Sequence, residues 1–555
     1  MTPNSGTIVA DWRPTASLDR RIIALLATRA AWWSACGATA LILLFPLFLV
    51  DVPPLLDYPN HLARMHVLAF GEHDAFLSRM YEQHWSIIPN LAIDLVMPAM
   101  LKVMPIYVAG RIVLAATLLL PLIGVLVYHR VAFGVRSYWP LAAALTAYNS
   151  LFLFGFMNFL LALGMALLVA AAWLRWRDRH PIWITAFGAL ATVAIFFMHL
   201  FGLVFLAVLL GSEELANFRW PNQTNGVSWS ALLRRAAMGV IAFAPPVVLY
   251  FLAPLNELGG EMTFRPLWHK LYSLVEPFMV YDGAWDVLTG GVFLAGIYLA
   301  CRFRHMRIAP GTTLALLVLF VAYLCSPFVM KQTGFIDARF PIMLGLLLFA
   351  GLLPVTLPPR VSLIIGGVLA LLFLARTASL AEVWYDHNRD LADFRRVIAA
   401  VEPGSRVLVV DVDETDAPDY WTTVPRGRHI PYFMRLDYHL PALLTIERHA
   451  FFPYLFTVAA KQPLTVRPPF DKIAIPEGLP PSWQSLVVGH RVHSDVPTPY
   501  LDNWQSNFDY VLLLNAGGGG DLSAYLPDRL ALLATADVAA LFRIRPLIPP
   551  LIPKP

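Results

Sequence analysis

Charged residues are scarce in this sequence. Only 14% of its 555 residues are charged, whereas 58% are hydrophobic. A soluble globular domain carries about a quarter charged residues, so most of this chain is excluded from facing water. The formal net charge is only +4, and the arginines lie between apolar runs. This pattern is typical of a membrane protein and gives no support to a nucleic-acid partner.

Cysteine is almost absent as well. The three cysteines, Cys36, Cys301 and Cys325, all lie inside apolar stretches, and residues 381–555 contain none. The sequence therefore excludes a disulfide framework and a site built from clustered cysteine and histidine ligands.

Long apolar runs are abundant in the first 380 residues. A run of about twenty apolar residues is long enough to cross a bilayer. The first run follows several arginines and has no small-residue cleavage site, so we expect a signal anchor that stays in the protein. We predict eleven spans, at 31–50, 107–128, 138–150, 156–174, 182–198, 200–213, 236–253, 286–301, 310–326, 340–356 and 361–379.

The basic loops predict the orientation of these spans. Arginine collects in alternate turnarounds, at 129–136, 175–180, 219–235, 302–307 and 360. With a cytoplasmic N-terminus every one of them is cytoplasmic, as the positive-inside rule requires. The segment 88–104 is apolar but contains Asp94, Pro98 and Lys102, and counting it as a span would move two basic loops outside. We therefore expect an interfacial helix within a long first external loop, 51–106.

Beyond residue 380 the composition changes. Charges return, and helix-like patterns at 391–401 and 526–533 alternate with strand-like runs at 406–411, 508–514 and 538–544. An odd number of spans places this region outside. The predicted fold class is an α-helical polytopic membrane protein with a C-terminal soluble α/β domain. Its parts are a cytoplasmic segment 1–30, a transmembrane domain 31–380, an external α/β domain 381–545 and a proline-rich tail 546–555.

Polar residues beside the apolar runs gather at the external face, and a bilayer penalises such residues unless they have a role. Directly after the first span come Asp57, Asn60, His61 and Arg64. If Pro59 opens a helix, spacings of three and four place Asp57, His61 and Arg64 on one face. The alternative is a capped helix with Asp57 or Asn60 as its N-cap and the other side chains solvated.

Other external segments carry further candidates. Lys331, Asp337 and Arg339 enter the tenth span from outside. A cation there either neutralises a lipid-linked phosphate or only extends to the headgroups and fixes depth. The remaining candidates stand in external turns, where packing or helix capping is the competing interpretation: His199, Glu276, Tyr281, Asp282 and Asn158.

The layout resembles the C-type (GT-C) membrane glycosyltransferases. The resemblance rests on a first span followed at once by a long external loop, on the acidic start of that loop, Leu56-Asp57-Tyr-Pro-Asn-His61, on many further spans and on an external C-terminal domain. It implies a hexosyl- or pentosyltransferase of a cell's inner (plasma) membrane with a periplasmic C-terminal domain. The implied donor is a polyprenyl-phosphate sugar, and the acceptor is a glycan, lipid or protein.

The resemblance also implies roles for the candidates. Asp57 is the expected base of an inverting displacement, assisted by His61 and Arg64. The expected ligands of the donor phosphate are Arg339, Lys331 and His199, and the expected contacts to sugar are Asp337, Asp282, Tyr281, Glu276, Asn60 and Asn158. Many family members carry two adjacent acids where this sequence has Asp57 alone. We therefore expect no metal site and no cofactor, with a divalent metal as the alternative.

Two other functions remain open at this stage. A transporter or flippase would carry polar residues through the middle of the membrane, whereas here they gather at one face. A non-catalytic protein that handles lipid-linked polymers would need no reactive residues at all.

Overall fold

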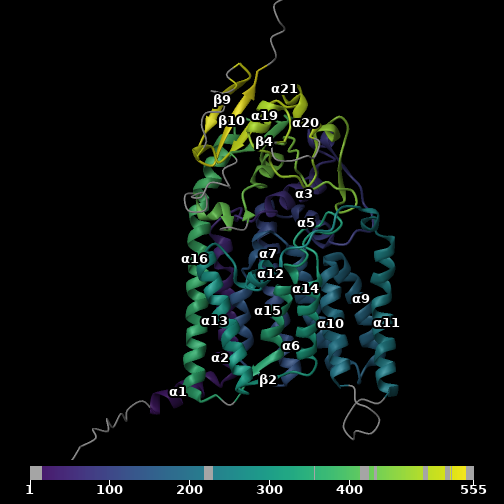
Figure 1. Cartoon of the computed structure of the whole chain (residues 1–555), viewed down its shortest axis with the longest axis vertical. Coiled ribbons are helices and arrows are strands. Elements are labelled where there is room, and N and C mark those ends of the chain that lie inside the picture. The colour runs from purple at the N-terminus through teal and green to yellow at the C-terminus, as the bar shows by residue number, and fades with distance from the viewer. Residues whose placement is uncertain are drawn as a thin grey trace, which may run out of the picture.

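The computed structural model describes residues 16–217, 229–355, 357–412, 424–430, 434–491, 498–518, 526 and 528–545. It consists of a bundle of long helices with a mixed α/β domain at one end (Figure 1). The chain is thus a polytopic helical membrane protein with a C-terminal α/β domain, which confirms the predicted fold class.

The bundle is built from apolar helices. In the described residues, eight are long and apolar enough to cross a membrane: α2 with its 3₁₀ extension (Arg29–Phe48), α6 (Ile106–Phe133), α8 (Met157–Trp176), α9 (Pro181–Met198), α10 (Leu200–Asn217), α11 (Trp229–Leu252), α13 (Gly283–Arg302) and α16 (Pro359–Ile398). Two shorter apolar helices, α14 (Thr312–Cys325) and α15 (Arg339–Gly351), pack together within the bundle. Outward-facing side chains such as Ile182, Trp183 and Phe251 are large, apolar and exposed. Lipid is the solvent that suits such a surface.

The prediction of a membrane-spanning α-helix at 138–150 is wrong. Residues 138–150 form the 3₁₀ helix η2 (Trp139–Thr146) and a connection to the short α7 (Ser150–Leu153). The segment packs against α6, α15 and α16. Irregular backbone is tolerated at membrane depth where protein covers it. The segment 88–104, expected to form an interfacial helix, contains the helix α5 (Ala92–Leu101), which has only ten residues and packs against α3 (Tyr58–Phe70).

The C-terminal domain contains a four-stranded sheet. Its order is β4 (Val407–Asp411), β8 (Tyr510–Leu514), β10 (Ala539–Ile544) and β9 (Leu530–Thr535), with β4 parallel to β8 and the other pairs antiparallel. All residues of β4 and β8 are buried, which explains their continuous apolar runs. The helix predicted at 526–533 is wrong, because residues 530–535 pair with β10 and tertiary pairing overrides a helical pattern.

Three connections hold this domain on the bundle. Helix α16 has 40 residues and so runs for about 60 Å, through the predicted boundary at 380. Strand β1 (Tyr81–Gln83) of the first external loop pairs with β7 (Leu464–Val466). Helix α3 packs against η6 (Leu440–Ala442) and α18 (Leu443–Glu447). The first external loop therefore lies between the bundle and the C-terminal domain.

The remaining elements are short. They are α1 (Ala16–Leu26), α4 (Leu77–Met80), η3 (Pro254–Glu257), α12 (Leu267–Ser273), η4 (Glu276–Phe278), the pair β2 (Met306–Ile308) and β3 (Leu352–Pro354), η5 (Arg426–Arg428), β5 (His429–Ile430), β6 (Met434–Arg435), η7 (Phe470–Ile473), α19 (Gln484–Val488), α20 (Pro499–Asp502), α21 (Trp504–Asn507) and η8 (Ala516–Gly518).

Candidate functional site

A cavity of about 460 Å³ lies where the bundle, the first external loop and the C-terminal domain meet. This volume is within the range of small-molecule sites. Seven of the twelve residues proposed from the sequence line it: Asp57, His61, Arg64, Asn158, His199, Lys331 and Arg339. The cavity thus joins residues that the sequence separates by almost 300 positions.

The main chain holds Asp57 at the edge of α3. Backbone N–H groups of Leu56 and Asp57 donate to the carbonyls of Leu153 and Phe154, at 2.8 and 3.1 Å. Gly155 has a φ of +85°, and a Cβ there would lie 3.1 Å from the Asp57 Cβ. Asp57 precedes the first residue of α3, but its side chain makes no capping hydrogen bond. The carboxylate is therefore available for chemistry.

The partner of Asp57 comes from the C-terminal domain. His439 Nδ1 lies 3.0 Å from Asp57 Oδ1, and the aspartate side chain is only 16% exposed. Burial raises the pKa of the Asp57 carboxyl, while the hydrogen bond and charge of His439 oppose that rise. Glu477 lies near enough to raise the same pKa further. A carboxylate with a raised pKa is a stronger proton acceptor than one on the protein surface.

His61 and Arg64 follow Asp57 on α3. Burial, together with the nearby Arg64 and His439, holds the pKa of His61 well below its usual value, so this imidazole is neutral. Arg64 donates two hydrogen bonds to the Asp94 carboxylate of α5, at 2.7 and 3.1 Å. Its charge is therefore compensated, and its contact with α5 fixes the position of α3.

Arg339 is the contrasting cation of the cavity. It begins α15, is 4% exposed, and lies between the rings of Phe156 and Phe201, 5.3 and 5.1 Å from their centroids. Its Nε has no hydrogen-bond partner among the described residues. The charge of Asp337 acts on this guanidinium, but Asp337 faces Arg265 at 3.9 Å, and no carboxylate in the described part of the chain lies within 4 Å of Arg339. A buried cation without a directly paired carboxylate is costly, and an anionic ligand would compensate it.

Two weaker candidates stand near Arg339. Lys331 Nζ donates to the Asn256 carbonyl at 3.2 Å, which leaves further donors on the ammonium group. His199 Nδ1 accepts a hydrogen bond from the Phe201 N–H at 3.1 Å. His199 therefore also has a structural role at the start of α10, as the packing interpretation expects.

The structure places the other five candidates outside the cavity. Tyr281 accepts from Trp384 Nε1 at 2.8 Å, and Asp282 caps α13 by accepting from the Trp285 N–H at 3.2 Å. The remaining three also have partners within the protein: Asn60 bonds to Tyr454 and Phe456, and Glu276 and Asp337 face Arg265 at 3.4 and 3.9 Å. These partners are structural, and they did not follow from the sequence pattern.

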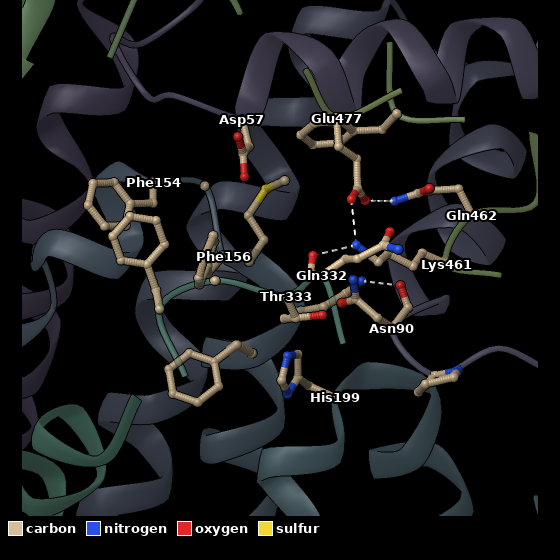
Figure 2. A pocket seen from close by; sticks show the side chains of 18 of the residues that line it. Asp57, Asn90, Phe154, Phe156, His199, Gln332, Thr333, Lys461, Gln462 and Glu477 are labelled. Carbon is tan, nitrogen blue, oxygen red and sulfur yellow. Dashed lines mark hydrogen bonds and ion pairs between the residues drawn. The ribbon is translucent and has the colours of Figure 1, made fainter. Parts of the chain in front are cut away.

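Sequence reasoning missed the contribution of the C-terminal domain. Lys461 Nζ donates to Glu477 Oε2 at 2.5 Å and to the Gln332 carbonyl at 2.7 Å, and Gln462 Nε2 donates to Glu477 Oε1 at 2.6 Å. Figure 2 shows these side chains along one side of the cavity. None of them belongs to a recognisable motif, and only the docking of the two domains brings them to Asp57.

The backbone around the cavity is strained. Among the described residues, eight other than glycine have a φ in the left-handed region, and five of these line the cavity: Asn90 (74°), Lys331 (49°), Gln332 (55°), Phe335 (56°) and Glu477 (61°). Each such residue costs about 1–3 kcal/mol, and such strain clusters at functional sites. The positive φ values could have pointed to this cavity, but no sequence pattern reveals them.

Comparison with known proteins gives only distant structural similarity. No protein-family model matches the chain, and no curated protein matches it. The structure is similar to the crystal structure of ArnT from Cupriavidus metallidurans in the apo state, with 13% identity and a TM-score of 0.49, over 93% of this chain and 98% of that one. It is also similar to a cryo-EM structure of the arabinofuranosyltransferase AftD from Mycobacteria, with 14% identity and a TM-score of 0.41, over 93% of this chain and 41% of that one.

Proposed function

We propose that this protein is a membrane glycosyltransferase of the GT-C type. In this proposal it transfers a sugar from a polyprenyl-phosphate donor to an extracytoplasmic glycan, lipid or protein acceptor. One observation carries the proposal: a single cavity beside the membrane helices holds a buried carboxylate, Asp57, and a buried guanidinium, Arg339, which has no carboxylate within 4 Å among the described residues. Glycosyl transfer from a lipid phosphate needs these two groups together.

The proposed chemistry is a direct displacement. Asp57 takes the proton of an acceptor hydroxyl as the acceptor oxygen forms its bond to the anomeric carbon. The bond between that carbon and the phosphate oxygen breaks, and the configuration at the anomeric carbon inverts. Negative charge grows on the departing lipid phosphate, where Arg339 neutralises it with help from Lys331. His61 and Arg64 hold α3, and therefore Asp57, in place.

The proposed reaction requires no metal ion. In this reaction Arg339 and Lys331 supply the positive charge that stabilises the departing phosphate. Asp57 is hydrogen-bonded to the imidazole of His439. We expect transfer to continue at an unchanged rate in excess EDTA, and loss of activity that added Mg²⁺ or Mn²⁺ restores would overturn this part.

The proposed orientation places the C-terminal domain outside the cytoplasm. Basic residues such as Arg177, Arg235 and Arg307 belong to the end of the bundle away from that domain, where Figure 1 shows β2. The positive-inside rule assigns that end to the cytoplasm. Labelling of single introduced cysteines by an impermeant reagent in intact cells tests this, on a background without native cysteines.

The first test of the reaction is Asp57→Asn in proteoliposomes that contain a synthetic polyprenyl-phosphate sugar. We expect transfer to fall by about 10²- to 10⁴-fold, the usual contribution of a general base. Asp51→Asn is the matched control, because Asp51 is 53% exposed and forms ion pairs with Arg111 and Arg395 at the surface. Full transfer by the Asp57→Asn protein would exclude Asp57 as the base. If cells without the protein accumulate an unflipped lipid-linked oligosaccharide instead of a polyprenyl-phosphate sugar, a flippase replaces the enzyme.

A further inference from the structure

One side of the cavity is aromatic. Phe154, Phe156 and Phe335 all line it, and their ring centroids lie 4.7 Å (Phe154 to Phe335), 6.0 Å (Phe154 to Phe156) and 6.3 Å (Phe156 to Phe335) apart. Figure 2 shows Phe154 and Phe156 on the side of the cavity away from Glu477 and Gln462. We call these three residues the aromatic wall.

The facing side is polar and belongs largely to the C-terminal domain. It consists of Glu477, Lys461 and Gln462, which we call the polar wall, in the hydrogen-bonded arrangement described above (Figure 2). Both carboxylate oxygens of Glu477 have a donor, and each keeps capacity for one more. The network holds acceptors and donors in fixed positions.

An unsatisfied group adds an independent observation. Asn158 lines the cavity and is 7% exposed, and its Nδ2 donates to the Asn90 carbonyl at 2.8 Å. Its Oδ1 is buried and has no hydrogen-bond partner in the part of the chain that the structure describes. A buried acceptor without a donor is unfavourable, so a ligand that carries hydroxyl groups would satisfy it.

A sugar ring matches this combination. It has faces of C–H groups that pack on aromatic rings and an edge of hydroxyls that donate to carboxylate and amide oxygens. The charges of the polar wall indicate which class of sugar it would bind. Lys461 neutralises Glu477. The polar wall therefore offers no unpaired carboxylate to the ammonium group of an amino sugar and no unpaired ammonium group to the carboxylate of a uronic acid.

We propose that the aromatic wall and the polar wall hold the transferred sugar, and that the Lys461–Glu477 pair selects a neutral, polyhydroxylated ring over amino sugars and uronic acids. The C-terminal domain then determines sugar specificity, while Arg339 in the bundle binds the phosphate. This inference rests on the proposed function only in naming the bound sugar as the transferred group.

Two variants change the charge of the wall in opposite directions. Lys461→Met leaves Glu477 without its counter-charge, and we expect acceptance of an amino sugar relative to a neutral one to rise at least tenfold in kcat/KM. Glu477→Gln leaves Lys461 unpaired, and we expect acceptance of a uronic acid relative to a neutral sugar to rise by a similar factor. The probes are nerylphosphoryl derivatives of a neutral pentose, a neutral hexose, an amino sugar and a uronic acid. Glu82→Gln is the control, because Glu82 lies on β1 with a 55% exposed side chain.

A second measurement keeps this inference separate from the reaction. Methyl glycosides of the same four sugars, and neryl phosphate alone, are titrated by saturation-transfer NMR with the purified full-length protein. We expect the wild type to bind the neutral glycosides best, and both variants to bind neryl phosphate as the wild type does. Selectivity that is unchanged in both variants, or loss of neryl phosphate binding, overturns the sugar site even if transfer continues. Selective binding of neutral glycosides without any transfer overturns the reaction and keeps the sugar site.

Discussion

Two buried arginines at opposite ends of the bundle differ in what surrounds them. Arg235 is 9% exposed and contacts two acids, Asp178 at 2.8 Å and Glu214 at 3.0 Å. Arg339 is 4% exposed, and its guanidinium packs against the rings of Phe156 and Phe201. Burial alone therefore does not distinguish the two sites. Direct contact with carboxylates does, because Arg235 has two such contacts whereas no described carboxylate lies within 4 Å of Arg339.

The difference teaches how to separate structural from functional charge in a membrane protein. Removing a charge from water costs several kcal/mol, and only a well-placed partner offsets that cost. The end of the bundle away from the C-terminal domain supplies carboxylates to Arg235 from neighbouring helices, so its charges connect the bundle. At Arg339 no carboxylate of the described residues lies within 4 Å, so part of the folding free energy is spent on a cation that an anionic ligand would compensate.

Of the two arginines, Arg339 has the larger expected effect, and this effect is on catalysis. We expect Arg339→Gln to lower the rate of transfer by about 10²- to 10³-fold, because it removes a donor that acts on charge in the transition state. The thermal midpoint of the purified protein should stay the same or rise, since the variant removes a buried charge that has no directly paired carboxylate. Transfer assays and differential scanning fluorimetry on the same preparations measure both.

The proposed difference between Arg339 and Arg235 is contradicted if the transfer rate and the thermal midpoint of Arg339→Gln fall together. An Arg339→Gln protein that loses stability in proportion to its activity would give Arg339 a structural role, like that of Arg235. Binding of neryl phosphate decides the cause, because the proposed role requires weaker binding in a protein that remains folded.

The opposite pattern is expected at Arg235. Arg235→Gln should lower the free energy of unfolding by about 1–2 kcal/mol, below the value for a fully buried pair because Asp178 is half exposed. The transfer rate per folded molecule should not change. Arg234→Gln is the matched control: Arg234 is 53% exposed and contacts the same Asp178 at 3.4 Å, so its loss should leave the thermal midpoint nearly unchanged. A fall in activity at constant stability would contradict the structural role of Arg235.

The smallest expected effect extends the comparison to the acid of the cavity. Asp57 acts as a base only when deprotonated, and His439 opposes the rise of its pKa. Removing that contact by His439→Leu should raise the pKa of Asp57, so the acidic limb of the kcat/KM profile should move to higher pH. A shift of one pKa unit gives about a tenfold loss on that limb and little change well above it. His439→Gln, whose amide still donates, should restore part of the profile, and an unshifted limb in His439→Leu would remove His439 from any role in positioning Asp57.

Sequence reasoning was most effective where the bilayer limits the choices. Apolar length predicted the bundle, and the buried runs predicted β4, β8 and β10. Polar residues near the external face were informative because a membrane tolerates few of them, and Asp57, His61, Arg64 and Arg339 do meet in one cavity. The irregular segment at 139–153 was missed because protein covers its backbone, a condition that hydropathy does not report.

The rest of the cavity depends on tertiary contacts. Asn60, Tyr281 and Asp282 have the same polar character as the lining residues, but their partners are main-chain groups and a tryptophan that become adjacent only after folding. His439 and Glu477 come from a domain that resembles an ordinary soluble fold. Their relation to Asp57 follows from how that domain docks, which no local pattern encodes.

The hydrogen bond between Asp57 and His439 joins residues 382 positions apart. During synthesis the ribosome therefore makes the proposed base early, and its partner emerges only after the last long apolar helix, α16. In the proposed orientation, the last domain must also be exported before it can dock on the first external loop. A half-inserted chain thus lacks part of the proposed reaction site, so the proposed activity can begin only after the C-terminal domain has been assembled on the bundle.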